Sequence, residues 1–215
     1  MRDIILFDLD GTLTDPAPGI TNSILHALSK MGRELPERES LYRFIGPPLV
    51  PAFQEFLGMT EDEAQRALLF YREYFSVTGL FENRVYDGIA EALKTLRSAG
   101  CTLVLATSKP EVFAARILEH FGLAEDFTLI CGASMDESRN TKDAVIGYAL
   151  ETLGHPAIDR VIMVGDRHHD VHGAAKFGIP TVGVLWGYGS QDELTDAGAV
   201  QTVSDVAQMT AVLMQ

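Results

Sequence analysis

The chain has few basic residues and no long hydrophobic run. Its 215 residues include 17 Lys and Arg against 30 Asp and Glu, which gives a formal net charge of −13. Nucleic-acid polymers and anionic membranes favour basic surfaces, so this balance argues against both as partners. No apolar stretch approaches the roughly 20 residues that cross a bilayer. Asp8 and Asp10 interrupt the apolar run near the N-terminus that a signal peptide would need. We therefore expect a cytoplasmic protein.

Cysteine is also scarce, because the chain contains only Cys101 and Cys131. Both lie inside apolar segments, where free cysteine is commonly buried. A reducing compartment disfavours a structural disulfide. We expect two buried free thiols.

Short apolar runs alternate with amphipathic stretches after residue 85. The runs have the length of buried strands, and the stretches have the apolar spacing of helices. This repeat predicts a parallel sheet covered by helices on both faces, which is a doubly wound, Rossmann-like α/β fold. The predicted strands, with one more at the N-terminus, are residues 4–7, 102–106, 128–131, 160–164 and 181–185.

Residues 15–85 break this alternation and have helical patterns throughout. Ile20, Ile24 and Leu28 share one helical face, and Thr60 to Glu63 has the sequence of a capping box. The length allows one well-buried domain that carries a smaller module. The sequence therefore predicts an α/β core of residues 1–14 and 86–215, with a helical module of residues 15–85 inserted after the first strand.

Two aspartates, Asp8 and Asp10, directly follow the first predicted strand. Alternation along a strand places both carboxylates on one side, where they must share a cation or a proton. Carboxylates at the end of a buried strand are costly without such a partner. An EF-hand is excluded, because its loop needs glycine at the sixth position and glutamate at the twelfth, and the chain has neither there.

Asp166 and Asp170 follow the strand predicted at 160–164. Four residues apart, they share a face if a helix begins there, although Asp170 could instead cap that helix. In open parallel sheets, ligands bind at the carboxyl ends of strands where the strand order reverses. Several carboxylates at that edge would repel one another without a metal. All-oxygen ligation with few protein donors favours Mg²⁺.

Thr107 and Lys142 add groups suited to a phosphate. Ser108 begins a second predicted capping box, Ser-Lys-Pro-Glu, whereas Thr107 has no such structural role. A hydroxyl beside the free N–H groups of a helix start forms a phosphate cradle. Lys142 opposes the dipole of the helix predicted at 141–153, so it is either solvated or directed into the carboxylates. In the carboxylate cluster it would neutralise Asp8 and a phosphate dianion.

Three nearby histidines, His168, His169 and His172, suggest zinc as an alternative metal, because a pair four residues apart on a helix can bind it. No cysteine or third imidazole is placed to complete such a site. We favour histidines at the surface or at the edge of a pocket.

These segments, in this order, resemble the motifs of the haloacid dehalogenase superfamily, specifically its Mg²⁺-dependent phosphatases. Asp8 to Thr12 resembles the first motif, Thr107 the second and Lys142 the third, while Gly165-Asp166 with Asp170 resembles the fourth. The resemblance covers essentially the whole chain. It implies that residues 15–85 form a cap that closes over the core.

Within that superfamily the chain looks like the phosphoglycolate phosphatases. Two of its motif sequences differ from those common in that group, because Asp143 follows Lys142 and Arg167 follows Asp166. These variant motif sequences, together with the segment 186–190, resemble members described as 5′-nucleotidases. The resemblance therefore implies a small phosphorylated metabolite as substrate, either a phosphoglycolate-like compound or a nucleoside monophosphate. For the assembly we expect a monomer or homodimer.

The same resemblance implies a role for each site residue. Asp8 is the expected nucleophile, which forms an aspartyl-phosphate, and Asp10 is the expected general acid and then base. The expected phosphate contacts are Gly11, Thr12, Thr107 and Ser108. Lys142 is expected to stabilise charge in the transition state, and Thr12 also to orient the loop. The expected Mg²⁺ ligands are Asp8, Asp10, Asp166 and Asp170. In the cap, Arg43 and Gly46 are candidates for substrate contact, with a solvated helix face as the alternative for Arg43.

Three rival functions use the same residues differently. A phosphomutase would share the core site and transfer the phosphoryl group to a second hydroxyl instead of water. A dehalogenase would use Asp8 without a metal and would not need Asp10. A catalytically silent interaction protein usually loses one of the carboxylates, and none is missing here.

Overall fold

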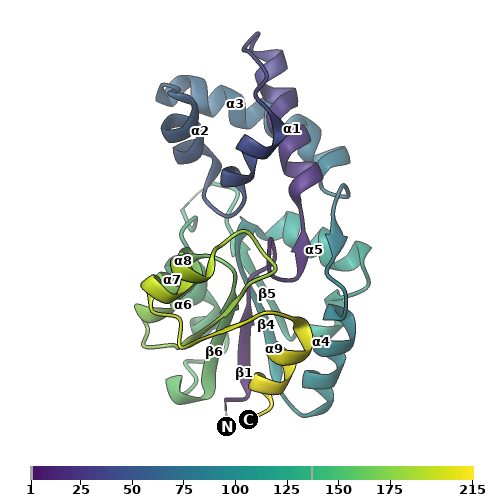
Figure 1. The fold of residues 1–215 in the computed structure, drawn as a ribbon, viewed down its shortest axis with the longest axis vertical. Coiled ribbons are helices and arrows are strands. Elements are labelled where there is room, and N and C mark those ends of the chain that lie inside the picture. Colours follow the sequence, from purple (N-terminus) through teal and green to yellow (C-terminus); the bar gives the residue numbers. More distant parts are fainter. Residues whose placement is uncertain (1, 137) are drawn as a thin grey trace. The chain divides into compact units, whose positions relative to one another are not determined.

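The computed structural model describes residues 2–136 and 138–215, and the chain divides into two compact units. The first unit joins Met1–Asp15 to Val85–Gln215, and the second is Pro16–Arg84 (Figure 1). The first unit is an α/β domain and the second is helical. No helix of the described residues is long and apolar enough to cross a bilayer.

The α/β unit is built on a six-stranded sheet with the order β5-β4-β1-β6-β7-β8. The pairs with β1 are parallel and in register, with Ile4 opposite Thr102 on one side and Val161 on the other. Strand order therefore reverses at β1, which creates the switch point where ligands bind in such sheets. The strands are β1 (Ile4–Phe7), β4 (Thr102–Pro110), β5 (Leu129–Ala133), β6 (Val161–Gly165), β7 (Thr181–Val184) and β8 (Gln201–Val203).

Helices cover both faces of this sheet, so the predicted doubly wound α/β fold is confirmed. Figure 1 shows α4 and α9 together on one side and α6 and α7 on the other. The helices of this unit are α4 (Ile89–Ser98), α5 (Glu111–His120), α6 (Lys142–Thr152), α7 (His168–Ala175), α8 (Gln191–Ala197) and α9 (Val206–Leu213). Two short 3₁₀ turns are η3 (Ala124–Asp126) and η4 (Ile158–Arg160).

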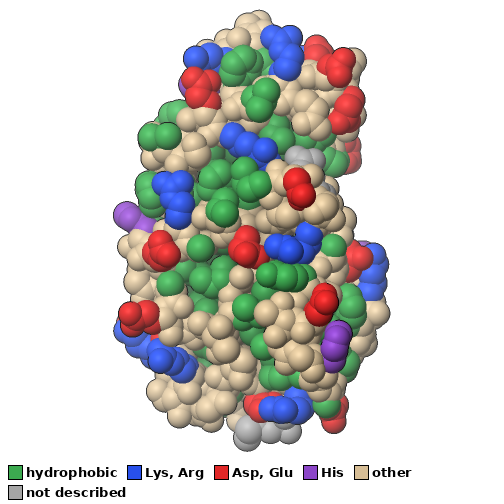
Figure 2. All heavy atoms as spheres, turned by 180° about the vertical axis from the view of Figure 1, so that it is seen from behind, with side chains coloured by type: hydrophobic (Ala, Val, Ile, Leu, Met, Phe, Trp, Pro, Cys, Tyr) green, Lys and Arg blue, Asp and Glu red, His purple; other side chains and the backbone are tan. Residues whose placement is uncertain are grey.

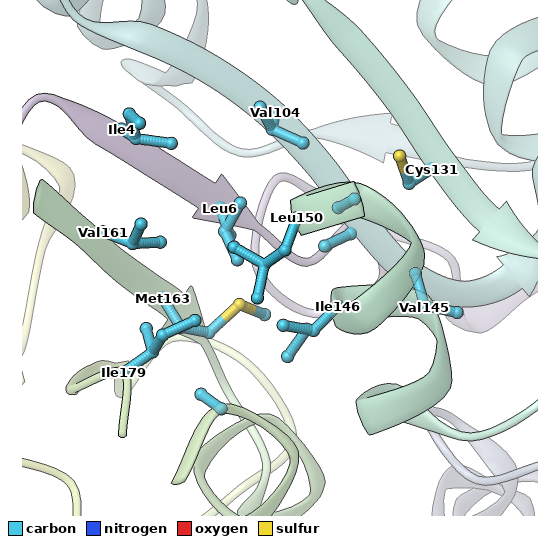
Figure 3. Packing of buried hydrophobic residues seen from close by; sticks show 13 residues of the cluster. Ile4, Leu6, Val104, Cys131, Val145, Ile146, Leu150, Val161, Met163 and Ile179 are labelled. Carbon is cyan, nitrogen blue, oxygen red and sulfur yellow. The ribbon is translucent and has the colours of Figure 1, made fainter. Parts of the chain in front are cut away.

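The core under α6 shows why these segments pack. Alternate residues of β1, Ile4 and Leu6, face Ile146 and Leu150 of the helix, with Met163 of β6 beside them (Figure 3). All are buried. This layer fixes α6 against the sheet and thereby fixes the start of the helix, where Lys142 lies.

The helical unit contains α1 (Ala17–Lys30), the 3₁₀ helix η1 (Arg38–Phe44), α2 (Leu49–Leu57), α3 (Glu61–Tyr74) and the π-helical turn η2 (Phe75–Gly79). The capping box predicted at Thr60 is present at the start of α3. Gly19 allows α1 to approach η2, because a Cβ there would lie 1.9 Å from the Gly79 carbonyl oxygen. The two-residue strands β2 (Thr14–Asp15) and β3 (Arg84–Val85) form a separate small sheet.

The second predicted capping box, at Ser108, is wrong. Strand β4 continues through Ser108 to Pro110, and α5 begins at Glu111 without a side-chain cap. The pairing of β4 with β5 shifts register between Thr107 and Pro110, so the chain is a bulged strand where a helix start was expected.

Charge is mixed over the visible surface. Figure 2 shows acidic side chains interspersed with Lys and Arg over the face that it draws, rather than a continuous basic surface. On this face, the described residues offer no extended surface of the kind that binds a polyanion.

Candidate active site

Three segments bring polar side chains to the carboxyl ends of β1, β4 and β6. Asp8 and Asp10 follow β1, Thr107 lies near the end of β4, and Asp166 follows β6. All four side chains are buried. The parallel sheet places them together because neighbouring strands end at the same edge.

Three carboxylates form the centre of this group. One oxygen each from Asp8, Asp166 and Asp170 lies within 4.8 Å of the others, and all three residues are buried. Burial raises the pKa of Asp166 well above its usual value, and the charges of Asp170 and Asp8 raise it further. Such a cluster is unfavourable unless cations offset its charge.

Lys142 supplies one cation to this cluster. Its Nζ lies 2.7 Å from Asp8 Oδ1 and 2.7 Å from Asp170 Oδ1, and it donates a hydrogen bond to the Ala106 carbonyl at 3.1 Å. Burial lowers the pKa of this lysine, but Asp170 and Asp8 more than offset that effect, so the net shift is upward. Lys142 is therefore an ammonium group at neutral pH, and it is directed into the carboxylates rather than into solvent.

Asp170 lies in the first turn of helix α7, where it is the N3 residue of a capping box and not the N-cap. Its Oδ2 accepts a hydrogen bond from the backbone N–H of Arg167 at 3.1 Å, and its Oδ1 pairs with Lys142. Both oxygens thus have protein partners. Burial is the main reason that the pKa of Asp170 is raised to about 6, an effect that Lys142 reduces.

Asp166 is held by groups from two other segments. Thr12 Oγ1 donates to Asp166 Oδ1 at 3.3 Å, and the Tyr188 backbone N–H donates to Asp166 Oδ2 at 2.8 Å. Gly11, with φ of 84°, packs so closely that a Cβ there would lie 2.1 Å from Asp166 Oδ2. A side chain at this position would displace the carboxylate.

The segment from Trp186 to Gly189 covers Asp166 from the other side. A Cβ on Gly187 would lie 2.4 Å from Asp166 Oδ2, and one on Gly189 would lie 1.9 Å from the Asp166 carbonyl oxygen. Trp186 Nε1 donates to the Thr12 carbonyl at 3.0 Å. In the sequence this segment is marked only by its resemblance to the family, although two glycines shortly after a buried strand indicate a close approach of backbone.

Asp10 pairs with a lysine that sequence reasoning missed. Lys109 Nζ lies 2.6 Å from Asp10 Oδ2, and both residues are buried. Burial raises the pKa of Asp10, while Lys109 counteracts part of this shift. The capping box predicted at Ser108 gives Lys109 no role in the site, whereas the bulge in β4 turns it inward.

The expected phosphate contacts lie near these groups. Thr107 is buried, and its Oγ1 accepts a hydrogen bond from the Lys109 backbone N–H at 3.3 Å. Ser108 is half-buried. The Gly11 N–H donates to the Thr14 carbonyl at 2.7 Å in this conformation, so a phosphate contact from it requires that bond to open.

Arg43 and Gly46, the other two candidates, lie in the helical unit. The Arg43 guanidinium donates to the Phe56 carbonyl at 2.9 Å and lies 4.6 Å from the centre of the Phe56 ring. Gly46 has φ of 107° in the loop before α2. Their contact with substrate stays a prediction.

The three histidines do not form a metal cluster among the described residues, where the group suited to a metal consists of carboxylates. His168 Nδ1 lies 2.7 Å from Glu193 Oε1. Burial lowers the pKa of His169 to about 4, so its ring is neutral at pH 7.

The expectation of two buried free thiols is confirmed for Cys131, while Cys101 is free and half-buried.

Comparison with known proteins identifies the family. The family described as haloacid dehalogenase-like hydrolase matches residues 5–184. The chain belongs to this family. It is 46% identical over 209 residues to a protein from Pseudomonas aeruginosa named 5′-nucleotidase, across 97% of this chain and 94% of that one. The crystal structure of a predicted phosphatase from Clostridium acetobutylicum is 46% identical and has a TM-score of 0.96, with 100% of this chain and 99% of that chain covered. The chain is a phosphatase.

Two further relatives have other names. The tyrosine-protein kinase PtkA of Mycobacterium tuberculosis is 47% identical over 189 residues, which span 88% of this chain and 64% of the relative. A phosphoglycolate phosphatase from Colwellia psychrerythraea is 25% identical over 205 residues, which span 92% and 90% of the two chains. Family membership is therefore shared by proteins named for different substrates.

Proposed function

We propose that this phosphatase is a Mg²⁺-dependent phosphomonoesterase that acts through an aspartyl-phosphate on Asp8. One observation carries the proposal: three buried carboxylates converge within 4.8 Å, and a single ammonium group, that of Lys142, bridges Asp8 and Asp170. This leaves excess negative charge in a buried site built for a phosphate dianion. The site therefore needs a further cation.

The donor set fits Mg²⁺. The ligands are oxygens, which hard divalent cations prefer, and few of them come from protein, which suits an ion that keeps several waters. Asp8, Asp166 and the Asp10 backbone carbonyl would hold the ion. Asp170, whose two oxygens already have partners, would act on it mainly through Lys142. When bound, the ion supplies charge neutralisation at a phosphate oxygen.

Asp8 and Asp10 divide the chemistry. The Asp8 carboxylate attacks phosphorus in line and displaces the alcohol, so that the phosphoryl group is held on Asp8. Asp10 protonates the departing oxygen and then takes a proton from the water that hydrolyses the intermediate. The buried position of both side chains excludes bulk water during these steps.

Lys142 and the end of β4 would bind the phosphoryl oxygens. The Lys142 ammonium lies beside Asp8, where it would stabilise the charge that develops on phosphate oxygens. The Thr107 and Ser108 hydroxyls, near the end of β4, would also bind these oxygens. We propose that the helical unit acts as the cap, in which Arg43 and Gly46 would contact the leaving group, and that the enzyme acts in the cytoplasm as a monomer or homodimer.

Nucleoside 5′-monophosphates are the substrate class that we propose first. The support is the name of the Pseudomonas relative, which matches nearly the full length of both chains at 46% identity. Phosphoglycolate is the second candidate, supported by relatives of lower identity such as the Colwellia protein at 25%. Both are phosphomonoesters and would use the same core residues.

Phosphate release tests the proposal. Purified protein is incubated with p-nitrophenyl phosphate, nucleoside monophosphates, 2-phosphoglycolate and phosphotyrosine, with Mg²⁺ or with EDTA. We expect release that requires Mg²⁺ and that Asp8→Asn abolishes. Turnover by Asp8→Asn near the wild-type rate would show that Asp8 is not the nucleophile. Turnover undiminished by EDTA would contradict the metal, and a requirement for a bisphosphate activator would indicate a phosphomutase.

A further inference from the structure

Lys109 is a buried lysine for which the proposed chemical steps have no role. Its side chain is 5% exposed, and its Nζ lies 2.6 Å from Asp10 Oδ2, whose own side chain is 11% exposed. Removing two charges from water is costly, and the mutual attraction repays that cost only in good geometry. A pair of this kind beside a reacting centre therefore calls for an explanation.

The bulge in β4 creates the pair. Thr107 is opposite Gly132 in β5, and the next paired residue is Pro110, opposite Ala133. Ser108 and Lys109 are thus extra residues that leave the ladder, which re-aims a side chain at a sheet edge.

Gly132 makes room for this bulge. A Cβ on Gly132 would lie 2.6 Å from the Lys109 carbonyl oxygen and 2.6 Å from Glu111 Cα. The Gly132 N–H also donates to Glu111 Oε2 at 3.2 Å. The turn that directs Lys109 to Asp10 is therefore a packed, hydrogen-bonded feature.

The two oxygens of Asp10 have different surroundings. Oδ2 contacts Lys109, whereas Oδ1 is buried and has no hydrogen-bond partner among the described residues. We propose that Lys109 is a positioning residue, which fixes the Asp10 carboxyl group through Oδ2 and leaves Oδ1 as the atom that transfers the proton. This inference rests on the proposed function of Asp10 as acid and base.

Transfer of the phosphoryl group to Asp8 is coupled to one proton transfer from Asp10. As the Asp8 oxygen forms its bond to phosphorus, the bond from phosphorus to the leaving oxygen breaks and its electron pair stays on that oxygen. The proton on Asp10 Oδ1 moves to the leaving oxygen, which departs as an alcohol. Lys109 Nζ stays beside Oδ2 and holds the resulting Asp10 carboxylate in place. In the second step a water proton returns to Oδ1, while the water oxygen displaces Asp8 from phosphorus.

A purely structural role for the ion pair of Lys109 and Asp10 predicts a different pattern of activity loss. If Lys109 only stabilises the fold, its removal lowers activity on every substrate by one factor. If it positions the acid, the loss is large for a poor leaving group, which needs a proton, and small for a good one. The ratio kcat/KM covers the steps through leaving-group departure, so it reports the acid role alone.

The experiment compares phenyl phosphate, with a poor leaving group, and p-nitrophenyl phosphate, with a better one. For Lys109→Met we expect kcat/KM on phenyl phosphate to fall roughly 100-fold, which is the lower end of the contribution of general acid catalysis. On p-nitrophenyl phosphate we expect a smaller fall, of about tenfold. Lys109→Gln, which keeps a hydrogen-bond donor, is expected to recover part of the loss on phenyl phosphate. Lys176→Met is the matched control, because it removes an exposed lysine that pairs with Asp143 at 2.8 Å, and we expect wild-type rates from it.

A double-mutant cycle tests whether Lys109 acts through Asp10. Once Asp10→Asn has removed the acid, adding Lys109→Met should cause little further loss on phenyl phosphate. Losses that multiply would overturn the inference, as would equal losses on the two substrates. Circular dichroism of each variant confirms folding, and Lys109→Gln carries the test if Lys109→Met does not fold.

The outcome separates this inference from the proposed function. Equal losses on both substrates, with wild-type turnover still abolished by Asp8→Asn, would overturn the role of Lys109 alone. Turnover that Asp8→Asn leaves intact would overturn the proposed function itself. Selective loss on phenyl phosphate together with inactive Asp8→Asn supports both.

Discussion

Gly187 packs against the carboxylate of Asp166, because a Cβ on Gly187 would lie 2.4 Å from Asp166 Oδ2 and 2.4 Å from the Gly11 carbonyl oxygen. The Asp166 carboxylate, which we propose as a metal ligand, is thus confined between two backbone segments. Tyr188 adds a hydrogen bond from its backbone N–H to the same oxygen at 2.8 Å. Asp166 is placed by a loop more than 20 residues further along the chain.

Gly187→Ala should therefore disturb the site without removing any functional group. We expect a loss of about 1–3 kcal/mol of unfolding free energy from overpacking and a fall in kcat/KM of roughly tenfold or more, because small misplacements of reacting groups are costly. Thermal unfolding and p-nitrophenyl phosphate turnover measure the two effects. Gly147→Ala is the control, since its nearest neighbour, at 3.2 Å, is the end of the Phe177 ring. Wild-type behaviour of Gly187→Ala would show that the loop adjusts freely.

Part of this site could be predicted from sequence because Asp8 and Asp166 each follow a buried apolar run. Asp8 and Asp166 end strands that are recognisable from four or five consecutive apolar residues, and parallel topology then brings them to one edge. Lys142 could be recognised because a lysine in the first turn of a helix opposes the helix dipole, which is unfavourable unless nearby carboxylates offset it.

Other features could not be read from local sequence. The inward turn of Lys109 depends on a register shift between β4 and β5, a tertiary feature that overrides the apparent capping box at Ser108. Strand β8 has only three residues, Gln201–Val203, too short for a periodic signal. Such elements are specified by packing against neighbours rather than by their own residues.

Mg²⁺ binding should be visible without catalysis. A ligand that binds only the native state raises its stability, by about 2.7 kcal/mol at 100 times Kd. We expect the Tm of the wild type to rise with Mg²⁺ concentration and that of Asp166→Asn to stay nearly constant. Asp159→Asn, at an acidic residue of the turn η4 outside the cluster, is the control and should respond like wild type. An equal rise in Asp166→Asn would remove Asp166 from the metal ligands.

Lys142→Met should be strongly destabilising in the absence of metal. It leaves Asp8 and Asp170 buried without their cation, and breaking a buried pair costs about 3–5 kcal/mol. We expect loss of turnover and a lower denaturation midpoint, part of which Mg²⁺ restores by offsetting the same charge. Lys176→Met, at a surface lysine that is 61% exposed, should change the midpoint little. A midpoint for Lys142→Met equal to that of Lys176→Met would mean that the cluster tolerates its charge without Lys142.

Glu193 should make stability depend on acid pH. It accepts hydrogen bonds from the His168 backbone N–H at 2.9 Å and from Arg167 Nε at 2.8 Å, which hold the start of α7 that carries Asp170. Burial raises the pKa of Glu193, but these donors outweigh it and lower the pKa to about 2.

The sign follows from comparing the two states. A glutamate in the unfolded chain has a pKa of about 4.3, so the stabilisation from Glu193 is complete above that value and is lost as pH falls toward 2. Because a quarter of this side chain is exposed, solvent screening limits the effect to about 1–2 kcal/mol. Glu193→Gln should therefore unfold more easily at pH 7 and approach the wild type near pH 2, as followed by urea unfolding at each pH. Glu125→Gln, at an exposed residue of η3, should parallel the wild type throughout. A gap between Glu193→Gln and the wild type that stays constant from pH 7 to pH 2 would mean that the ionised carboxylate is not what holds the start of α7.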